Sequence, residues 1–464
     1  MSMLTRNIVR LVVFGIINVS LFWIASENSL SSAEMHPTYE NASDGQRYWG
    51  TAINVAKNGS FIIGEENGYP LTRAGPLPAL FFSVPIKFFG IEGAPAWIVF
   101  GQCVLLYLTG IMFGRLGRLF HANEGLVCGL IIFNPNLISL AHHAQSDLLF
   151  TFVFALFLYH LAPLLVKGER ITAYHLVWLG ISAGALPLAR PLGVYVLLVL
   201  PLLLLMVWIL TPELRARTDW SSTCRKFVSV ALLAALITSP WAYRNYLVFG
   251  EISLTQSEGI MMQWHYNALK KQMSDPTILP DLNSLMEQYE VTEDCANKLS
   301  CKSGLTSVYL TAMWSLPKWV LVKNWSVSNV KLFFSGGASQ LGRYLGLDPV
   351  NFANFLSGNR TLGVEKRKIT NLLMGGDKVF VYIVLFGILF AGISRFFGVI
   401  GVVLSVARCR SRALTLFFLF IIGLFMGIYL FSSIGRFRAP LEPILALFAA
   451  SGLCFIRSKM GKVD

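Results

Sequence analysis

Long apolar runs alternate with short polar connections along most of the chain. The first run covers roughly residues 11–25, and from about residue 95 further runs follow one another at regular intervals. A helix needs about 20 apolar residues to cross the hydrocarbon core of a bilayer. The pattern therefore predicts an all-α, polytopic membrane protein with about ten transmembrane helices, or eleven if residues 379–407 break near Arg395.

Basic residues gather in alternate connections between these runs. Arg6 and Arg10 precede the first run, and further clusters stand in residues 211–226, in residues 408–412 and at the C-terminus. Lysine and arginine are enriched in the cytoplasmic connections of membrane proteins. We therefore expect both termini in the cytoplasm and the first polar segment, residues 27–75, on the outer side.

The spacing of the runs divides the chain into three parts. Residues 1–246 are expected to form a membrane module with a first outer loop, residues 27–90, whose short helices lie against the membrane. Residues 247–377 are mixed polar and aromatic and contain no clean spanning run, so they are expected to form a larger extracytoplasmic segment. Residues 378–464 are expected to supply the last transmembrane helices.

The composition agrees with a membrane protein and argues against one function class. Of the 464 residues, 55% are hydrophobic and only 14% are charged, whereas soluble domains carry about 25% charged residues. The formal net charge is +13, but the basic residues lie mainly in short connections, as the positive-inside rule requires. We therefore do not expect a nucleic-acid partner.

Two cysteines share the extracytoplasmic segment. Cys295 and Cys301 could close a small disulfide loop on the outer side, where thiols oxidise. Spacing alone does not establish a bridge, so two unpaired thiols are the open alternative. The adjacent pair His142 and His143 lacks further partners for a metal ion, and no metal site is predicted.

Ionisable side chains are almost absent from the interior of the predicted spans, and Arg395 is the main exception. Ion-coupled transporters place such groups near the middle of the membrane, where they are costly and functional. Here they stand at the predicted outer ends of the spans and in the outer loops, as Asp44, Arg47, Arg73, Asp147, Arg190, Arg244, Lys318, Arg436 and Arg438. This distribution favours a site at the boundary between lipid and water.

Six short motifs stand in a fixed order along the chain. They are an acidic-x-x-Arg-Tyr pattern, a basic residue before a proline-rich helix, an Asp at the start of the fourth span, a Leu-x-Arg-Pro turn, a Pro-Trp-x-x-Arg-Asn-Tyr sequence and an Arg-x-Arg-x-Pro turn. Their residues, in this order, are Asp44, Arg47 and Tyr48; Arg73, Pro76 and Pro78; Asp147; Arg190; Pro240, Trp241, Arg244, Asn245 and Tyr246; and Arg436, Arg438, Pro440 and Pro443.

With these motifs the chain resembles the GT-C superfamily of glycosyltransferases over nearly its full length. It looks most similar to the bacterial branch that contains the lipid A aminoarabinose transferases and relatives of the protein O-mannosyltransferases. The resemblance implies transfer of a sugar from a polyprenyl-phosphate donor, with undecaprenyl phosphate as the carrier, to an acceptor hydroxyl outside the bacterial inner membrane. The acceptor would be a glycolipid, a surface polysaccharide or a protein.

The resemblance also implies a chain that acts as a monomer and a separate enzyme that makes the donor. No cofactor is required, and a divalent metal is compatible with the family but not predicted here. Many relatives carry a second acid directly after the loop Asp, where this chain has Gly45. That departure disfavours a protein mannosyltransferase, and the missing large soluble domain disfavours transfer of a whole oligosaccharide to asparagine.

The chemistry of such a transfer assigns roles to the motif residues. Asp44 is expected to accept the proton of the acceptor hydroxyl as general base, with Asp147 as a second catalytic residue. A guanidinium pairs with phosphate in two parallel hydrogen bonds and stays charged, so it suits the donor phosphate. The expected phosphate ligands are Arg47, Arg73, Arg190, Arg244, Arg436 and Arg438. The expected supporting residues are Tyr48, Tyr243 and Tyr246. Direct attack would invert the anomeric carbon.

Simpler roles and other functions stay open. Asp44 and Asp147 could each cap a helix, and the arginines could anchor helix ends in the headgroup region. A flippase or transporter of lipid-linked sugars would carry charged residues along a transmembrane path, which the apolar spans disfavour. A polysaccharide polymerase or ligase would use diphosphate-linked donors and a large outer loop with paired arginines, for which residues 249–377 leave room.

Overall fold

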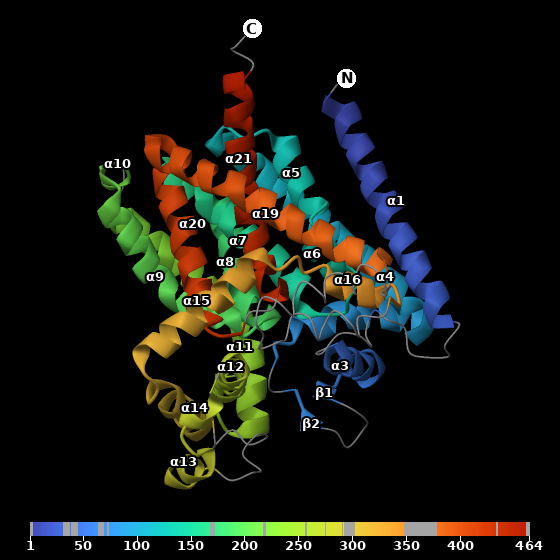
Figure 1. Cartoon of the computed structure of the whole chain (residues 1–464), viewed down its shortest axis with the longest axis vertical. Helices are drawn as coiled ribbons and strands as arrows, with labels where there is room; N and C mark the ends of the chain where they lie inside the picture. Colours follow the sequence, from blue (N-terminus) through green and yellow to red (C-terminus); the bar gives the residue numbers. More distant parts are fainter. Residues whose placement is uncertain are drawn as a thin grey trace.

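We describe a computed structural model of the chain, shown in Figure 1. The structure describes residues 3–30, 38, 45–63, 69–71, 74–167, 172–216, 220–255, 258–273, 275–289, 291, 302–347, 378–432 and 435–460. Within these residues the fold is helical apart from one short antiparallel ribbon, in which β1 (Ile62–Ile63) pairs with β2 (Tyr69–Pro70). The prediction of an all-α membrane protein is confirmed.

Long apolar helices make up most of the N-terminal half and all of the C-terminal part. The long ones of the N-terminal half are α1 (Met3–Leu30), α4 (Leu77–Gly117), α7 (Ser146–Lys167), α9 (Leu192–Leu210) and α11 (Trp220–Phe249). Shorter helices between them are η1 (Arg118–Phe120), α5 (Glu124–Ile132), α6 (Pro135–Ala141), α8 (Ala173–Ala189) and α10 (Pro212–Arg215). The C-terminal part contains α19 (Lys378–Ala407), α20 (Cys409–Ile428), η5 (Gly435–Leu441) and α21 (Glu442–Met460).

Shorter helices stand outside this group. One, α3 (Gly45–Asn58), follows the first long helix in the chain. The others are α12 (Glu258–Gln272), η2 (Pro276–Ile278), α13 (Leu282–Gln288), α14 (Lys302–Trp314), α15 (Lys318–Phe334) and α16 (Ser339–Tyr344). Figure 1 shows α12, α13 and α14 together at one end of the molecule, away from both chain termini.

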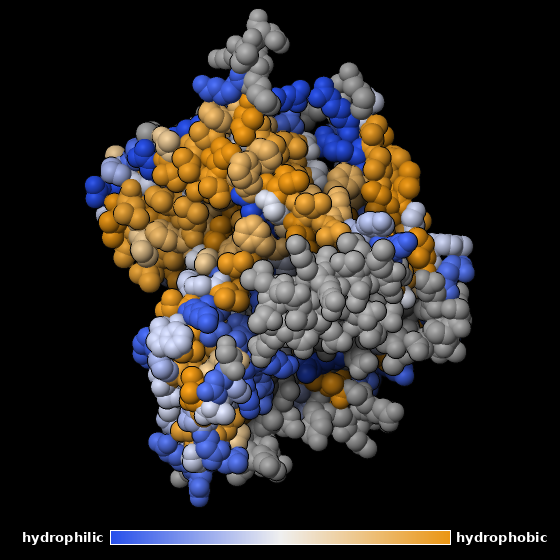
Figure 2. Space-filling view, in the orientation of Figure 1, coloured by the Kyte–Doolittle hydropathy of each residue, from blue (hydrophilic) through white to orange (hydrophobic). Residues whose placement is uncertain are grey.

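Among the described residues, seven helices are long and apolar enough to cross a membrane, or eight if the bent pair α5–α6 is one span. Two shorter apolar helices, Ala173–Ala189 and Arg412–Ile428, fall below that length. The count of ten spans therefore stays a prediction. Figure 2 shows continuous hydrophobic surface over the long helices and a mixed, more hydrophilic surface over α12–α14.

The sequence also predicts a helix in the membrane interface at residues 76–89 and a new span from about residue 95. The structure has a break in helical geometry between these two parts, at Gly90, where φ is 73°. Only glycine adopts this positive φ at little cost, so α4 changes direction there. Phe82 before the kink and Ile98 after it belong to one buried hydrophobic cluster with Tyr48, Trp49 and Ala52 of α3.

The centre of the fold is formed by α7 and α21. Within their most apolar stretches, 67% and 72% of the residues are buried, compared with 11% for α11. Helices such as α1 and α11 expose large apolar side chains instead, among them Trp23 and Leu236. Exposed apolar side chains are stable where lipid replaces water as solvent, so these helices form the lipid-facing rim.

A close helix crossing joins α19 to α21 through two glycines. A Cβ atom placed on Gly401 would lie 1.9 Å from the carbonyl oxygen of Phe448, and one on Gly452 would lie 2.1 Å from that of Phe397. Small residues at such crossings let transmembrane backbones approach closely. No side chain larger than hydrogen fits at either position without moving a helix.

The same two helices are joined by an ion network around Glu442, the first residue of α21. Its side chain is 1% exposed, and its carboxylate accepts hydrogen bonds from Arg395 of α19 at 2.9 and 3.0 Å. Arg438 of η5 donates a further hydrogen bond to it, and Asn134, between α5 and α6, donates another at 3.0 Å. Arg438 also donates to the carbonyl of Ser335, just after α15, at 2.9 Å. One carboxylate thus connects four parts of the chain.

We expect Gly401→Ala to destabilise the protein by about 1–3 kcal/mol, because an overpacked crossing forces the two helices apart. Thermal unfolding of the purified protein measures this. The matched control is Gly392→Ala on the same helix, where nothing lies within 4 Å of the added Cβ. Equal melting temperatures for the two variants would contradict the close crossing.

We expect Glu442→Gln to cost about 3–5 kcal/mol of stability, because it leaves two buried guanidiniums without their counter-charge. The loss is measured as a lower melting temperature and a lower yield of folded protein. Glu124→Gln is the control, since Glu124 pairs with Arg118, whose side chain is 67% exposed. An exposed pair of this kind contributes little, so the control should melt like the unmodified protein.

Candidate functional site

A small cavity of about 100 Å³ lies at the start of α9 and the end of α20, and its lining combines three arginines with mainly apolar surface. Four parts of the chain that are far apart in the sequence supply its walls, the last being the end of α20 together with the start of η5. The lining residues are Arg47 and Tyr48 of α3; Arg190, Pro191 and Leu192 of the α8–α9 turn; Met261, Trp264 and His265 of α12; Ile428, Tyr429 and Ser432 at the end of α20; and Arg436 and Phe437 of η5.

The turn between α8 and α9 places Arg190 in this cavity. Arg190 has an extended backbone that ends α8, and Pro191 follows with the fixed φ that suits the start of a helix. The guanidinium donates a hydrogen bond to the carboxylate of Asp147, in the first turn of α7. Both side chains are largely buried, at 12% and 2% exposure. This pair fixes the direction of Arg190, and it brings two predicted site residues together.

A pair of stacked aromatic rings holds the second arginine beside the first. The rings of Tyr429 and Phe437 stack with their centroids 4.6 Å apart. The guanidinium of Arg190 lies 5.7 Å from the centroid of Phe437, and that of Arg436 lies 5.2 Å from it. A cation over an aromatic face is attracted by the ring quadrupole. Two positive charges are therefore held close together in a largely buried place.

The helix α3 supplies a third arginine. Its buried face, Tyr48, Trp49 and Ala52, packs against Leu71 and Phe82. The hydroxyl of Tyr48 donates to the hydroxyl of Ser146 at 3.1 Å, which joins α3 to the start of α7. Arg47 precedes Tyr48 and lines the cavity. The predicted base Asp44 comes directly before α3 in the sequence and lies outside the described residues, as does Arg73.

The helix α12 supplies the wall that the sequence analysis did not identify. Met261, Trp264 and His265 are spaced i, i+3 and i+4, so they share one face of the helix. Another face, with Tyr266 and Leu269, packs against α14. The ring of His265 hydrogen-bonds through Nδ1 to the hydroxyl of Ser432 at 3.1 Å. Burial lowers the pKa of His265 to about 4, so the ring is neutral at pH 7.

Two predicted phosphate ligands lie elsewhere. Arg244 donates to the carbonyls of Leu71 and Phe61 at 3.1 and 3.2 Å and lies over the ring of Trp241, so it ties α11 to the β-ribbon. Arg438 is held in the network around Glu442. The remaining predicted residues that do not line the cavity are Tyr243 and Tyr246, which are 63% and 49% exposed on α11. Cys295 and Cys301 lie outside the described residues.

No group of three or more His, Cys, Asp or Glu side chains that could hold a metal ion occurs among the described residues. The candidate site is instead rich in arginine. His142 and His143 are both buried beside it in the fold: Nε2 of His142 hydrogen-bonds to Asn18 at 3.0 Å, and Nδ1 of His143 hydrogen-bonds to the carbonyl of Ser139 at 2.6 Å. These contacts give both histidines structural partners.

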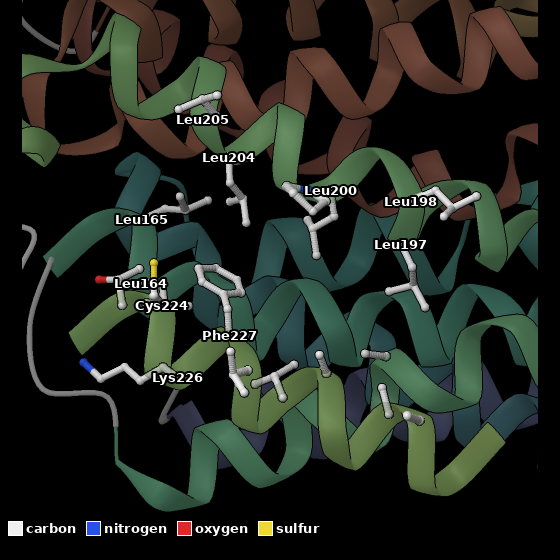
Figure 3. Close-up of a pocket in the computed structure, with 18 of the residues that line it drawn as sticks. Leu164, Leu165, Leu197, Leu198, Leu200, Leu204, Leu205, Cys224, Lys226 and Phe227 are labelled. Atoms are coloured by element: carbon white, nitrogen blue, oxygen red, sulfur yellow. The ribbon is translucent and has the colours of Figure 1, made fainter. Parts of the chain in front are cut away.

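A second, larger cavity of about 630 Å³ lies between α7, α8, α9 and α11. Figure 3 shows leucines of α7 and α9 and Phe227 of α11 around it, with Lys226 near one end. Its walls are almost wholly aliphatic or aromatic. Pro187 and Val194 also line it, three residues before and four residues after Arg190. Residues on both sides of the α8–α9 turn therefore line this cavity, whereas the turn itself, Arg190 and Pro191, lines the smaller one.

No protein-family model and no curated protein matches this sequence. Solved structures do match it. ArnT from Cupriavidus metallidurans in the apo state is 16% identical with a TM-score of 0.39, over 95% of this chain and 77% of that one. Its form bound to undecaprenyl phosphate is 14% identical with a TM-score of 0.42, over 96% and 77%. The archaeal oligosaccharyltransferase AglB from Archaeoglobus fulgidus, in complex with an inhibitory peptide and a dolichol-phosphate, is 16% identical with a TM-score of 0.49, over 95% and 50%.

Both neighbours are GT-C glycosyltransferases. They come from the superfamily that the ordered sequence motifs resemble. The chain spans only half the length of AglB. All three TM-scores lie below 0.5, so the activity of this chain has to be argued from its own residues.

We expect the protein to lose about 2 kcal/mol of stability between pH 7 and pH 5 through His265. The folded-state pKa of His265, about 4, lies below the ordinary value of 6.5. Between these values the unfolded chain binds the proton and the folded one does not, so stability falls as the pH is lowered. In His265→Gln the difference in melting temperature between the two pH values should shrink. His121→Asn, at an exposed position, should leave it unchanged.

Proposed function

We propose that this chain is an integral-membrane glycosyltransferase that takes its sugar from a polyprenyl-phosphate donor. The observation that carries the proposal is the convergence of Arg47, Arg190 and Arg436 on one small cavity at the α8–α9 turn, while the helices on both sides of that turn line a large apolar cavity. A lipid-linked phosphate needs both a cationic site for its head and an apolar site for its chain. The motifs that carry the sequence resemblance include all three arginines.

In this proposal the donor phosphate binds between Arg190 and Arg436. Each guanidinium offers parallel N–H donors to phosphate oxygens, and Phe437 keeps both arginines near one another. Negative charge on the phosphate grows as the glycosidic bond breaks, so fixed positive charges stabilise the transition state more than the ground state. Asp147 orients Arg190 through their ion pair. Arg244 and Arg438 support the site from a distance through their backbone contacts.

The prenyl chain occupies the apolar cavity between α9 and α11. Pro187 and Val194 line this cavity on either side of the turn that carries Arg190. Along α11, the lining residues extend from Thr238 to Cys224. That stretch of helix is about 20 Å long at 1.5 Å per residue. The chain would leave the cavity toward lipid along α11, whose surface is largely exposed.

Asp44 acts as general base in the proposed reaction. It accepts the proton of the acceptor hydroxyl, the hydroxyl oxygen bonds to the anomeric carbon, and the polyprenyl phosphate leaves with the electrons of the broken bond. Arg47 and Tyr48 lie in the first turn of α3 and line the cavity, and Asp44 directly precedes this helix in the sequence. The attack inverts the anomeric carbon, and arginines alone balance the leaving phosphate.

The acceptor is proposed to be a glycolipid, a surface polysaccharide or a protein on the outer side of a bacterial inner membrane. The chain would act as a monomer, with a separate enzyme supplying the donor. The sugar would then be presented where the arginine-lined cavity meets the outer side of the membrane.

Arg395 is buried within one of the described spans, where it pairs with Glu442. It lines neither cavity, so it has no role in the proposed reaction.

We expect Arg190→Gln to weaken the binding of undecaprenyl phosphate at least tenfold, since it removes a charge-assisted hydrogen bond worth about 1.5–3 kcal/mol. Binding is measured by native mass spectrometry of the purified protein. Arg118→Gln, an exposed arginine outside both cavities, should bind like the unmodified protein. Equal binding by all three proteins would refute the phosphate site.

We expect Asp44→Asn to bind undecaprenyl phosphate normally but to lower transfer by about 10²–10⁴-fold, the usual contribution of a general base. Transfer is measured by comparing envelope glycolipids and glycans in a deletion strain complemented with each variant. Normal transfer by a folded Asp44→Asn protein would remove Asp44 from the mechanism.

A further inference from the structure

The helix α15 buries polar side chains and exposes apolar ones, the reverse of a helix on the surface of a water-soluble protein. Asn324, Ser328 and Asn329 are buried against the rest of the protein. The outward face carries five large apolar side chains that are 41–68% exposed, namely Trp319, Val322, Val327, Val330 and Phe334. A face of this composition is stable against lipid but costly against water.

The buried face of α15 fixes the direction of this apolar face. The hydroxyl of Ser328 donates a hydrogen bond to the carbonyl of Phe431, just after α20, at 3.0 Å. The indole N–H of Trp325 donates to the carbonyl of Met426, within α20, at 3.1 Å. Gln272, the last residue of α12, donates to the hydroxyl of Ser328 at 2.9 Å. These contacts hold α15 in one rotation about its axis.

The place of α15 in the fold agrees with a position at the membrane surface. Figure 1 shows α15 between the ends of the long helices and the group formed by α12, α13 and α14. In Figure 2 the surface changes there from mainly hydrophobic to mixed. Tryptophan is enriched where hydrocarbon meets headgroups, and Trp319 points outward in the first turn of α15.

Three exposed lysines share this helix with the apolar side chains. They are Lys318, Lys323 and Lys331, and the sequence of α15 contains no acidic residue. Among the described residues, no carboxylate forms an ion pair with any of them. The ammonium of Lys318 donates to the carbonyl of Trp314 at 3.0 Å, which uses one of its three protons. Basic side chains at this depth attract anionic lipids more than zwitterionic ones.

A second copy of the chain fits this face less well than lipid does. Most homodimers are two-fold symmetric, so the same face of each copy would meet the other. Such a pairing would bring two sets of three lysines together, and like charges across an interface oppose binding. Anionic headgroups complement the same charges.

We propose that α15 lies in the membrane interface and binds the headgroups of anionic phospholipids through Lys318, Lys323 and Lys331. The apolar side chains between the lysines enter the upper part of the acyl chains, and the lysines reach the phosphates. No residue of α15 lines either cavity. The inference therefore goes beyond the proposed function and does not depend on it.

The fluorescence of Trp319 tests the contact with lipid. The full-length protein is reconstituted in nanodiscs with or without brominated acyl chains, and the emission of Trp319 is the difference between the unmodified protein and Trp319→Phe. We expect brominated lipid to quench most of this emission and aqueous acrylamide to quench little of it. Quenching by acrylamide alone would place Trp319 in water, and quenching by neither would indicate a covering protein. Either result overturns the proposal.

Native mass spectrometry of the full-length protein tests the lysines with phosphatidylglycerol, which is anionic, and phosphatidylcholine, which is zwitterionic. The variant replaces all three lysines, as Lys318→Gln, Lys323→Gln and Lys331→Gln. We expect it to bind phosphatidylglycerol at least about tenfold more weakly and to bind phosphatidylcholine like the unmodified protein.

The matched control removes the same charge from exposed positions of α3 and α12, as Lys57→Gln, Lys270→Gln and Lys271→Gln. It should bind both lipids like the unmodified protein. An equal loss of phosphatidylglycerol in the two triple variants, or no loss in the first, would overturn the headgroup site. Arg190→Gln should retain phosphatidylglycerol, so failure of the donor site and failure of the α15 site give different results.

Discussion

The buried carboxylate of Glu442 is the interaction on which the candidate site depends most. It neutralises Arg395 and Arg438, and through them it connects α19, η5 and the end of α15. Without that carboxylate, two guanidiniums would be buried in a membrane interior that cannot solvate them. Arg436 and Phe437 directly precede Arg438 in η5 and line the small cavity. The network around Glu442 therefore also positions this wall of the cavity.

The site combines two means of holding cations near one another. Arg190 is fixed by a carboxylate on α7, and Arg436 is fixed against the face of Phe437. In the proposed reaction, both arginines would therefore be held in place before the donor phosphate binds. Such preorganisation stabilises a developing negative charge without the cost of reorienting dipoles during the reaction.

The sequence predicted the helical membrane class well, because a series of apolar runs of spanning length is stable as helices in a bilayer and would aggregate in water. It also predicted that Arg190 and Asp147 belong to one site, since both stand at helix ends on the same predicted side. Trp264 could not be predicted, because the pairing of α12 with the end of α20 is a long-range contact with no local pattern. The sequence analysis did not single out Glu442, because its partners Asn134 and Arg395 lie far from it in the sequence.

The kink at Gly90 joins two directions in one continuous backbone. Phe82 before the kink and Ile98 after it share one buried cluster with Tyr48, Trp49 and Ala52 of α3, the helix that carries Arg47. Bilayer thickness changes the tilt of spanning helices. We therefore expect bilayer thickness to affect the position of Arg47 through the part of α4 that follows Gly90.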